Sequence, residues 1–523
     1  MRPQPPLGRS AGLVVPLFSL QSRSGGGIGE IPDLAALGPW LNRAGLQAVQ
    51  LLPVGTLPAG ESSPYSALSA MAIDPVYVSL AHVSDYAALG GDVRLPLSDQ
   101  VALRGARSSP EVAYAAVRQS KDSALRLAFS LFWDVDWLRS TARAGAFASF
   151  VSWEEWWLGD YALYCALRAK FGDRPWRDWP EPLASREPAA IDEARRELEQ
   201  EIYYHQYVQW LADAQWEAAR EALGKVRLFG DFPFMVSADS ADVWANQGTF
   251  RFDRTVGTPP DAFSDTGQDW GLPVYRWDAM AAQDDRWLRQ RARRMARLYD
   301  GYRVDHLVGF FRTYSRGSGE TLGDFDPDTV EAQQAQGERV LRLLIETGAQ
   351  VTAEDLGSIP DFVRASLAAL GVPGYKVLRW ERHWAQPGRP FLPSSSFAPV
   401  SVATTSTHDI EPLALWWSVI DSSDRLAMLH ALEWQGPPPE LYDARLHETL
   451  VRFACAAGSD LLLLPIQDVF GWRDRINVPA TVGEHNWTWK VPLTVEELAT
   501  DGRAGEAADW LHVILKESRR TDG

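Results

Sequence analysis

Short apolar runs that end in polar or acidic residues recur along this chain, and helical patterns lie between them. The first two runs, residues 12–16 (GLVVP) and 46–53 (LQAVQLLP), flank residues 31–44, whose apolar positions recur at spacings of three and four. This pattern predicts a strand, an amphipathic helix and a second strand. Similar runs near positions 228, 303, 352, 376, 403 and 462 bring the predicted strands to eight.

Alternation of strands and helices predicts a parallel sheet, and eight such units suggest a closed (β/α)8 TIM barrel of the α/β class. A doubly wound open sheet is the alternative, but the chain has no GxGxxG turn to favour it. From residue 83 to residue 224 the pattern is helical, with clustered aromatic residues. We therefore predict a barrel from residues 1–82 and 225–523, with residues 83–224 as a large helical insertion after strand 2.

Two stretches between the strands have patterns of their own. In the insertion, one helix is expected to open at Trp153, and another, in which Tyr203 and Tyr207 are four residues apart, is expected to stop at Gly224. Helical spacing favours packing over a ligand platform for these aromatic residues. Residues 258–277 are rich in Pro and Gly and are predicted to be a long loop, whose aromatic residues favour a functional role over disorder.

Composition and charge narrow the possible partners. Of 523 residues, 46% are hydrophobic and 23% charged, as in soluble globular proteins. A net charge of −17 and the lack of a basic run exclude a nucleic-acid partner. Two cysteines, Cys165 and Cys455, are too few for a disulfide framework, and the N-terminus shows neither a secretory leader nor a membrane span. We expect a cytoplasmic protein without a membrane partner.

Four acids follow predicted strands: Asp231, Asp305, Glu354 and Asp409, after the third, fourth, fifth and seventh. Strand C-termini meet at one face of a barrel, where residues are commonly catalytic, although independent loop acids remain an alternative. On a strand, Arg303 and Asp305 would point the same way. The arginine should lower the pKa of Asp305, as an ordinary ion pair would also do.

Converging carboxylates suit glycosyl transfer with retention, which uses two carboxyl groups about 5 Å apart. In that scheme Asp305 is the ionised nucleophile, Glu354 is the acid with a pKa raised by neighbouring carboxylates, and Asp409 stabilises positive charge. His408 and His306 would add hydrogen bonds. No HExxH motif, paired metal-ligand histidines or Gly-rich phosphate loop is present, so neither a metal nor a nucleotide cofactor is implied.

Several long motifs occur in order: SSPYSALSA (62–70), WLGDYALYCALRAKFGDRPWRDWP (157–180), GDFPFMVSADSADVW (230–244), TPPDAFSDTGQDWGLPVYRW (258–277), RVDH (303–306), AEDLG (353–357), STHD (406–409) and NVPATVGEHNWTW (477–489). With them the chain resembles the amylomaltases, or 4-alpha-glucanotransferases, of the alpha-amylase clan. The resemblance implies a barrel without a C-terminal β-domain, no cofactor, and transfer of maltodextrin segments between α-1,4-glucans.

The resemblance also implies roles for individual residues. It puts the nucleophile at Asp305, the acid/base at Glu354 and the transition-state stabiliser at Asp409. Sugar contacts would come from Tyr65, Asp231, Asp261, Gln268, Trp270, Arg303, His408 and Asn477.

The chain departs from the family's usual motifs at Ala262, Leu272, Leu307, Val308 and Ile410. These changes leave the acceptor preference and the balance of transfer against hydrolysis open. An amylase-type hydrolase and a non-catalytic maltodextrin-binding protein therefore remain alternatives, and the sequence does not fix the oligomeric state.

Overall fold

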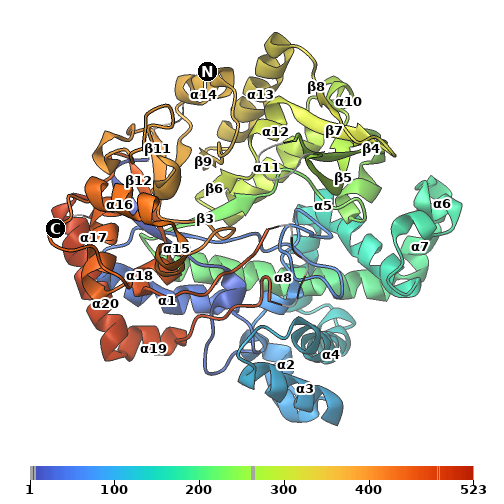
Figure 1. Ribbon diagram of the computed structural model, residues 1–523. Coiled ribbons are helices and arrows are strands. Elements are labelled where there is room, and N and C mark those ends of the chain that lie inside the picture. Colours follow the sequence, from blue (N-terminus) through green and yellow to red (C-terminus); the bar gives the residue numbers. More distant parts are fainter. Residues whose placement is uncertain are drawn as a thin grey trace.

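A closed barrel of eight parallel strands forms the centre of the molecule (Figure 1). The computed structural model describes residues 4, 7–260, 266–479, 481, 483 and 485–521. In the order in which they pair around the barrel, the strands are β1 (Ser10–Val14), β12 (Leu461–Pro465), β11 (Ser401–Thr404), β10 (Gly374–Val377), β9 (Gln350–Ala353), β6 (Gly301–Val304), β3 (Arg227–Phe232) and β2 (Ala48–Gln50). All eight lie where the sequence predicted them, which confirms the barrel.

The barrel strands are apolar on both faces because one face fills the interior and the other lies under helices. Every residue of β12 is buried, and its register pairs Leu461 with Ser10 of β1, which closes the ring. The larger helices on the outside are α1 (Ile31–Arg43), α11 (Arg286–Leu298), α13 (Val330–Ile345), α14 (Asp361–Leu370), α17 (Ala444–Cys455) and α20 (Gly502–Glu517).

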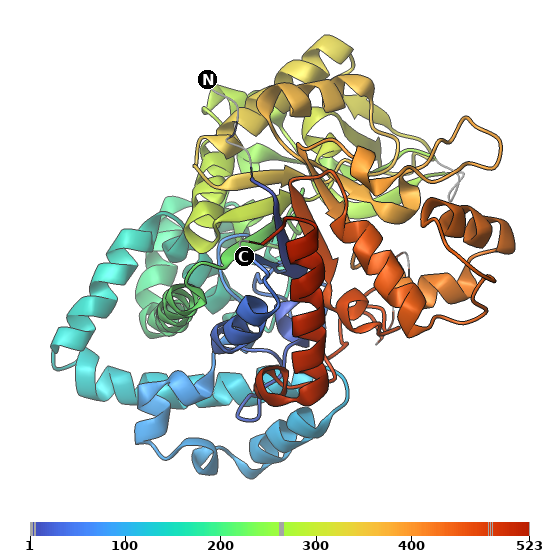
Figure 2. The same cartoon turned by 90° about the vertical axis from the view of Figure 1, so that its left-hand side faces the viewer.

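Helix α1 shows how the sequence fixes these elements. A capping box between Glu30 and Asp33 starts it, and its periodic residues Leu34, Leu37 and Leu41 are all fully buried. In Figure 2 the C-terminal helix α20 lies alongside β1, although the two are at opposite ends of the chain. The described C-terminal segment consists of α19 (Val495–Thr500) and α20 and contains no β-domain.

Residues 83–224, all of which the structure describes, contain no strand, as predicted. Their helices are α2 (Ser84–Ala88), α3 (Leu97–Ser108), α4 (Tyr114–Phe132), α5 (Ala142–Lys170), α6 (Glu181–Ala184), α7 (Pro188–Glu197) and α8 (Glu199–Leu223). Because α8 packs along α1 and shares one apolar core with the barrel, the division into a barrel and a separate insertion subdomain stays a prediction.

Two predictions within the insertion have different outcomes. Helix α8 ends at Gly224, whose φ of 63° is the conformation that favours glycine, as predicted. The expected helix start at Trp153 is wrong, because α5 begins eleven residues earlier behind the N-cap Thr141, whose hydroxyl accepts a hydrogen bond from the N–H of Ala144. The aromatic stripe is packing, with the rings of Tyr207 and Phe132 5.0 Å apart.

The prediction of one long loop over residues 258–277 is wrong, because most of its described residues belong to a second, antiparallel sheet. Its strands, in spatial order, are β5 (Gln268–Tyr275), β4 (Phe250–Thr258), β7 (Thr313–Gly317) and β8 (Asp324–Asp326). Gly271 and Pro273 hid β5 in the sequence, and both are tolerated because β5 is an edge strand.

Short helices complete the part of the chain that is described: α9 (Ala241–Ala245), α10 (Trp277–Ala282), α12 (Val308–Phe311), α15 (Leu413–Val419), α16 (Ser422–Ala431) and α18 (Ile466–Phe470). No helix among the described residues combines the length and the apolar character that crossing a bilayer requires.

Candidate active site

Three carboxylates meet at one guanidinium at the C-terminal ends of neighbouring barrel strands. Arg303, near the end of β6, is 7% exposed; its Nη1 donates to Asp231 on β3 at 2.5 Å. Its Nη2 donates to Asp305 Oδ1 at 2.9 Å and to Glu354 Oε2, just beyond β9, at 2.8 Å. The sequence prediction that these acids converge is therefore confirmed, and Arg303 and Asp305 do point the same way.

The shared nitrogen fixes how far apart two of these carboxylates lie. Because Asp305 Oδ1 and Glu354 Oε2 contact the same Nη2, the two oxygens are at most about 6 Å apart. Retaining glycosidases separate their two carboxyl groups by about 5–5.5 Å, whereas inverting enzymes leave room for a water molecule.

A turn directly after β6 orients a further donor. His306 has a φ of 42°, which is uncommon for a residue other than glycine, and its backbone N–H donates to Glu354 Oε2 at 2.8 Å. The His306 ring contacts Trp270 of β5 edge to face, with centroids 4.9 Å apart. The antiparallel sheet thereby brings Trp270 next to the carboxylates. Gln268 lies beside Trp270 and accepts a hydrogen bond from its Nε1 at 3.1 Å.

Asp409 lies on the segment after β11 and is held from both sides. Asn477 Nδ2 donates to Asp409 Oδ1 at 2.6 Å, and His408 Nε2 is 3.3 Å from Oδ2. Arg475 Nη2 donates to the Asp409 carbonyl at 2.8 Å. These contacts set the position of a carboxylate whose side chain is 42% exposed.

Tyr65, from the loop of residues 62–70, connects Asp409 to the arginine cluster. Its hydroxyl donates to Asp231 Oδ2 at 2.9 Å and lies 3.1 Å from His408 Nε2. Its ring stacks on that of His408 with centroids 5.6 Å apart. Of the site residues predicted from sequence, Asp261 lies outside the described residues. Ala262, one of the departures from the family's motifs, also lies outside them.

Comparisons with known proteins decide the family. The model of the family described as 4-alpha-glucanotransferase matches residues 15–494. The chain belongs to the 4-alpha-glucanotransferase family. It is an enzyme, a glycosyltransferase that acts on α-1,4-glucans.

Its relatives are similar over most of their length. The 4-alpha-glucanotransferase of Chlamydia pneumoniae is 31% identical over 93% of this chain and 92% of that protein, and that of Thermus thermophilus is 33% identical over 86% and 89%. The solved amylomaltase of Streptococcus agalactiae, in complex with acarbose, has a TM-score of 0.83 at 25% identity and covers 98% of this chain and 100% of that chain. The amylomaltase of Corynebacterium glutamicum, at 24% identity and a TM-score of 0.77, shares the fold over 96% of this chain and 75% of that one.

For this 4-alpha-glucanotransferase family member, the pKa directions expected from the sequence for Asp305 and Glu354 are wrong. Burial raises the pKa of Asp305 to about 8, against the opposing effect of Arg303. Burial also acts on Glu354, but Arg303 and the backbone N–H of His306 together hold its pKa below the ordinary value. Glu354 has that second donor, whereas the N–H that faces Asp305, from Phe234, is 3.5 Å away. These opposite directions favour Asp305 over Glu354 for a proton that the two carboxyl groups share.

Asp409 and His408 each favour the charged form of the other. Burial opposes the charge of Asp409, yet His408 and the Asn477 amide hold the pKa of Asp409 well below its ordinary range. Burial alone would lower the pKa of His408. The charge of Asp409 and its hydrogen bond to His408 act in the opposite direction, and the pKa of His408 is raised. Asp409 thus stays ionised near neutral pH, as the sequence analysis expected.

Sequence reasoning missed two residues that support Asp409. One is Arg475, described above. The other is Asp468, which is 1% exposed; its Oδ2 accepts hydrogen bonds from Thr405 Oγ1 at 2.5 Å and Ser406 Oγ at 2.6 Å, and its Oδ1 accepts one from Leu413 N–H at 2.6 Å. The available signal for Asp468 was an acid shortly after a barrel strand, because it lies in α18, the helix that follows β12.

The departures from the family's motifs differ in their surroundings. Leu307 is fully buried in the main core, so it acts on the site only through packing. Val308 and Leu272 are partly buried against the same core. Ile410 lines a small cavity together with His408 and Arg475.

Proposed function

We propose that the protein is a retaining 4-alpha-glucanotransferase that moves α-1,4-glucan segments from a donor to an acceptor through a covalent glycosyl-Asp305 intermediate. The observation that carries the proposal is the shared contact of Asp305 and Glu354 with Arg303 Nη2, which keeps their oxygens within about 6 Å. Asp305 is the nucleophile, Glu354 the acid/base and Asp409 the stabiliser of positive charge.

In the first step Asp305 Oδ attacks the anomeric carbon while the bond from that carbon to the glycosidic oxygen breaks. Glu354 gives a proton to the departing oxygen. Because the opposite pKa shifts favour the shared proton on Asp305, this proton must move to Glu354 before Asp305 can attack. Positive charge developing at the anomeric carbon favours this exchange, because it stabilises an ionised carboxylate beside it.

In the second step a hydroxyl of the acceptor glucan attacks the same carbon, gives its proton to Glu354 and releases Asp305 as a carboxylate. Asp409, which His408 and Asn477 keep ionised, stabilises the oxocarbenium-like transition state of both steps. No metal or other cofactor takes part in these steps.

Sugar contacts are proposed for Tyr65, Asp231, Asp261, Gln268, Trp270, Arg303, His408 and Asn477. The aromatic faces of Tyr65 and Trp270 offer apolar surfaces next to hydrogen-bonding groups, which suits a pyranose ring. The acarbose complex of the similar streptococcal amylomaltase supports a glucan-like ligand for the cleft.

Incubation with maltotriose tests the transfer reaction. Transfer yields glucose together with oligosaccharides longer than maltotriose. Glucose and maltose in hydrolytic proportion, without longer products, would instead identify an amylase-type hydrolase. Binding of maltotriose without any turnover would identify a maltodextrin-binding protein.

The covalent intermediate has a separate test. In a Glu354→Gln variant, α-maltotriosyl fluoride can react because fluoride leaves without protonation, whereas release of the glycosyl group lacks its general base. The C1–F bond breaks and a bond from C1 to Asp305 forms. We expect a maltotriosyl mass increase on the peptide that contains Asp305. Its absence in Glu354→Gln, or its presence in Glu354→Gln/Asp305→Asn, would refute the assignment.

We also propose a cytoplasmic location. Cys165 and Cys455 are both free thiols, and burial raises the pKa of each to about 12, which makes them unreactive. These features are compatible with a reducing compartment.

A further inference from the structure

A buried arginine that the proposed steps do not use lies on helix α11. Arg291 is 1% exposed, and among the described residues it forms no ion pair with a carboxylate. Burial lowers the pKa of its guanidinium, and holding an unpaired cation in a protein interior is costly. Buried charges of this kind concentrate at functional sites.

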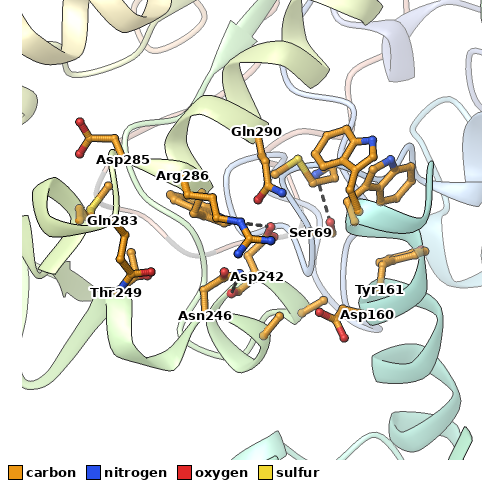
Figure 3. Close-up of a pocket in the computed structure, with 17 residues that line it drawn as sticks. Ser69, Asp160, Tyr161, Asp242, Asn246, Thr249, Gln283, Asp285, Arg286 and Gln290 are labelled. Carbon is orange, nitrogen blue, oxygen red and sulfur yellow. Dashed lines mark hydrogen bonds between the residues drawn. The ribbon is translucent and has the colours of Figure 1, made fainter. Parts of the chain in front are cut away.

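Helix α11 separates two different surroundings. Arg286 and Gln290 line a polar cavity of about 230 Å³ between α11 and the helical insertion (Figure 3). Arg291 reaches the barrel instead, where its Cζ lies 3.9 Å from the centre of the Phe232 ring on β3. There it lines a small cavity of about 40 Å³ together with Asp231. The guanidinium is therefore close to the carboxylate cluster without being part of it.

The acid on the far side of Arg291 has other partners. Asp242, which Figure 3 shows at the wall of the larger cavity, accepts hydrogen bonds from Ala70 N–H at 2.7 Å and from Trp287 Nε1 at 3.4 Å. The charges of Asp242 and Asp305 both favour the charged form of Arg291, but neither acid forms a hydrogen bond with it.

The hydrogen bonds of Arg291 go to the turn that follows β3 and to its support. Its Nη2 donates to the Pro233 carbonyl at 2.5 Å, and its Nη1 donates to the Tyr275 hydroxyl at 3.4 Å. The Tyr275 hydroxyl in turn donates to the Phe234 carbonyl at 2.8 Å. Two consecutive carbonyls of this turn are thus held, one from α11 and one from β5 of the antiparallel sheet.

The peptide between Pro233 and Phe234 connects Arg291 to Asp305. This peptide is trans, so its C=O and N–H point in opposite directions within one plane. Arg291 binds the C=O, and the N–H, which belongs to Phe234, faces Asp305 Oδ2 at 3.5 Å. A charge-assisted hydrogen bond at the carbonyl fixes the plane and strengthens the N–H as a donor. Such a long contact tightens when its acceptor becomes a carboxylate in the reacting complex.

We propose that Arg291 is a positioning residue, which holds the Pro233–Phe234 peptide with its N–H directed at Asp305 and thereby stabilises the ionised nucleophile. The proposal rests on the proposed function, in which Asp305 is the nucleophile. The same N–H favours the carboxylate of Asp305 before it attacks the anomeric carbon and again when the acceptor releases it. Arg291 itself does not touch the glucan.

Other titratable or charged groups also face these two residues. Around Asp305 they are Asp231 from β3, Arg303 from β6, Glu354 after β9, His408 after β11 and Tyr65 from the loop of residues 62–70. Around Arg291 they are Asp242 from α9 and Tyr275 from β5. A substitution at Arg291 leaves all of them in place, so a changed pH dependence reports on Arg291 and the donor that it holds.

The pH dependence of kcat/KM for maltotriose, in the unmodified protein and in Arg291→Met, tests the proposal. Loss of the oriented donor and of the positive charge should raise the pKa values of the Asp305–Glu354 pair, which the two limbs of the profile report. We expect both limbs to move upward by about one pH unit and kcat to fall about tenfold, because one pKa unit is a tenfold change in an equilibrium. Arg291→Lys keeps the charge and a donor and should recover part of both.

Arg294→Met is the matched control. Arg294 is also 1% exposed on α11 and also donates to a backbone carbonyl, that of Met71 at 2.9 Å, but its charge faces Asp213, which Arg297 pairs as well. The control should lower the melting temperature and leave both limbs in place. The same result in Arg291→Met, a lower melting temperature with an unchanged profile, would reduce Arg291 to a structural role and overturn the proposal.

Urea unfolding gives a readout that does not depend on turnover. A double-mutant cycle with Asp305→Asn isolates the coupling between Arg291 and the charge of Asp305. Arg291→Met should destabilise the unmodified protein more than the Asp305→Asn variant at pH 9, and both by a similar amount at pH 5, where Asp305 is protonated. Equal coupling at the two pH values would contradict the proposal. If Arg291→Met does not fold, Arg291→Lys replaces it in the cycle and the profile.

The cycle also separates this proposal from the proposed function. If the unmodified protein fails to elongate maltotriose, the proposed function fails. The cycle still decides whether Arg291 supports the charge of Asp305, because unfolding needs no substrate.

Discussion

Asp468 has no contact with the proposed nucleophile, yet we predict that Asp468→Asn reduces turnover strongly. Its carboxylate binds both ends of the segment that carries His408 and Asp409: the hydroxyls of Thr405 and Ser406 before them and the Leu413 N–H after them. An amide has one acceptor oxygen. If this oxygen keeps the hydrogen bond from Leu413 N–H, the NH2 group of the asparagine faces the two hydroxyls. The hydroxyls of Thr405 and Ser406 must then accept hydrogen bonds from it, whereas they donate to Asp468.

The magnitude follows from the hydrogen bonds that the change weakens. Hydrogen bonds to a charged group contribute about 1.5–3 kcal/mol each, and neutral ones about 0.5–1.5 kcal/mol. Replacing three charge-assisted bonds by neutral ones should therefore destabilise the protein by about 3–4.5 kcal/mol. A shift of about 1 Å in a positioned group can cost about 100-fold in rate, and Asp409 is attached to this segment. We expect kcat for maltotriose to fall about 10–100-fold with little change in KM.

The assay is initial-rate release of glucose from maltotriose, combined with urea unfolding monitored by circular dichroism. Asp421→Asn is the matched control, because Asp421 accepts hydrogen bonds from Asp424 N–H and Ser423 Oγ at the exposed start of α16, remote from β11. It should leave kcat unchanged. If Asp468→Asn unfolds at lower urea than the unmodified protein but keeps its kcat within twofold, the carboxylate stabilises the fold without positioning Asp409, and the reasoning fails.

Three further predictions concern the site and the helix end. Asn477→Ala removes the 2.6 Å hydrogen bond to Asp409. We expect kcat for maltotriose to fall about 10–100-fold, because a hydrogen bond to a charged acceptor contributes about 1.5–3 kcal/mol. A pH–rate profile with kcat unchanged would contradict this. Burial raises the folded-state pKa of Asp305 to about 8, so the stability that its proton contributes is present at acid pH and is lost as the pH rises through about 8. Asp305→Asn mimics the protonated form and should therefore raise the melting temperature more at pH 8 than at pH 5. An equal change in melting temperature at both pH values would refute the shift. Gly224→Ala forces alanine to a φ of 63° and should destabilise the protein by about 1–2 kcal/mol in urea unfolding, with kcat unchanged. Gly248→Ala is the control and should not destabilise the protein, because Gly248 is exposed, has no positive φ and has open space for a Cβ.

The barrel could be predicted from the sequence because each of its strands is short, apolar and followed by polar residues. Runs such as LLLLP at β12 are apolar throughout because both faces of a parallel barrel strand are covered. The antiparallel sheet could not be predicted in the same way. Its strand β5 is exposed or partly exposed at Gln268 to Leu272 and contains Gly271 and Pro273, which are turn signals in most other settings.

The candidate site, like the fold, could be predicted only in part. Strand ends brought Asp231, Asp305, Glu354 and Asp409 together, since spacing and topology alone determine which residues reach that face. The directions of the pKa shifts could not be predicted, because they depend on burial, on the shared guanidinium and on which carboxylate a backbone donor faces. The turn at His306 aims its N–H at Glu354 and not at Asp305, and nothing in the pattern of residue types indicates that direction.

The site's charge imbalance offers a reason for its chemistry. Arg303 supplies one positive charge to three carboxylates, of which Asp231 is fully buried, so full ionisation would leave two uncompensated negative charges in a poorly solvated place. Such a cluster favours retaining a proton, and burial raises the pKa of both Asp231 and Asp305. A retaining transferase needs one proton shared between nucleophile and acid/base. One guanidinium among three acids therefore holds the carboxylates together and leaves the excess negative charge that favours retention of an acidic proton.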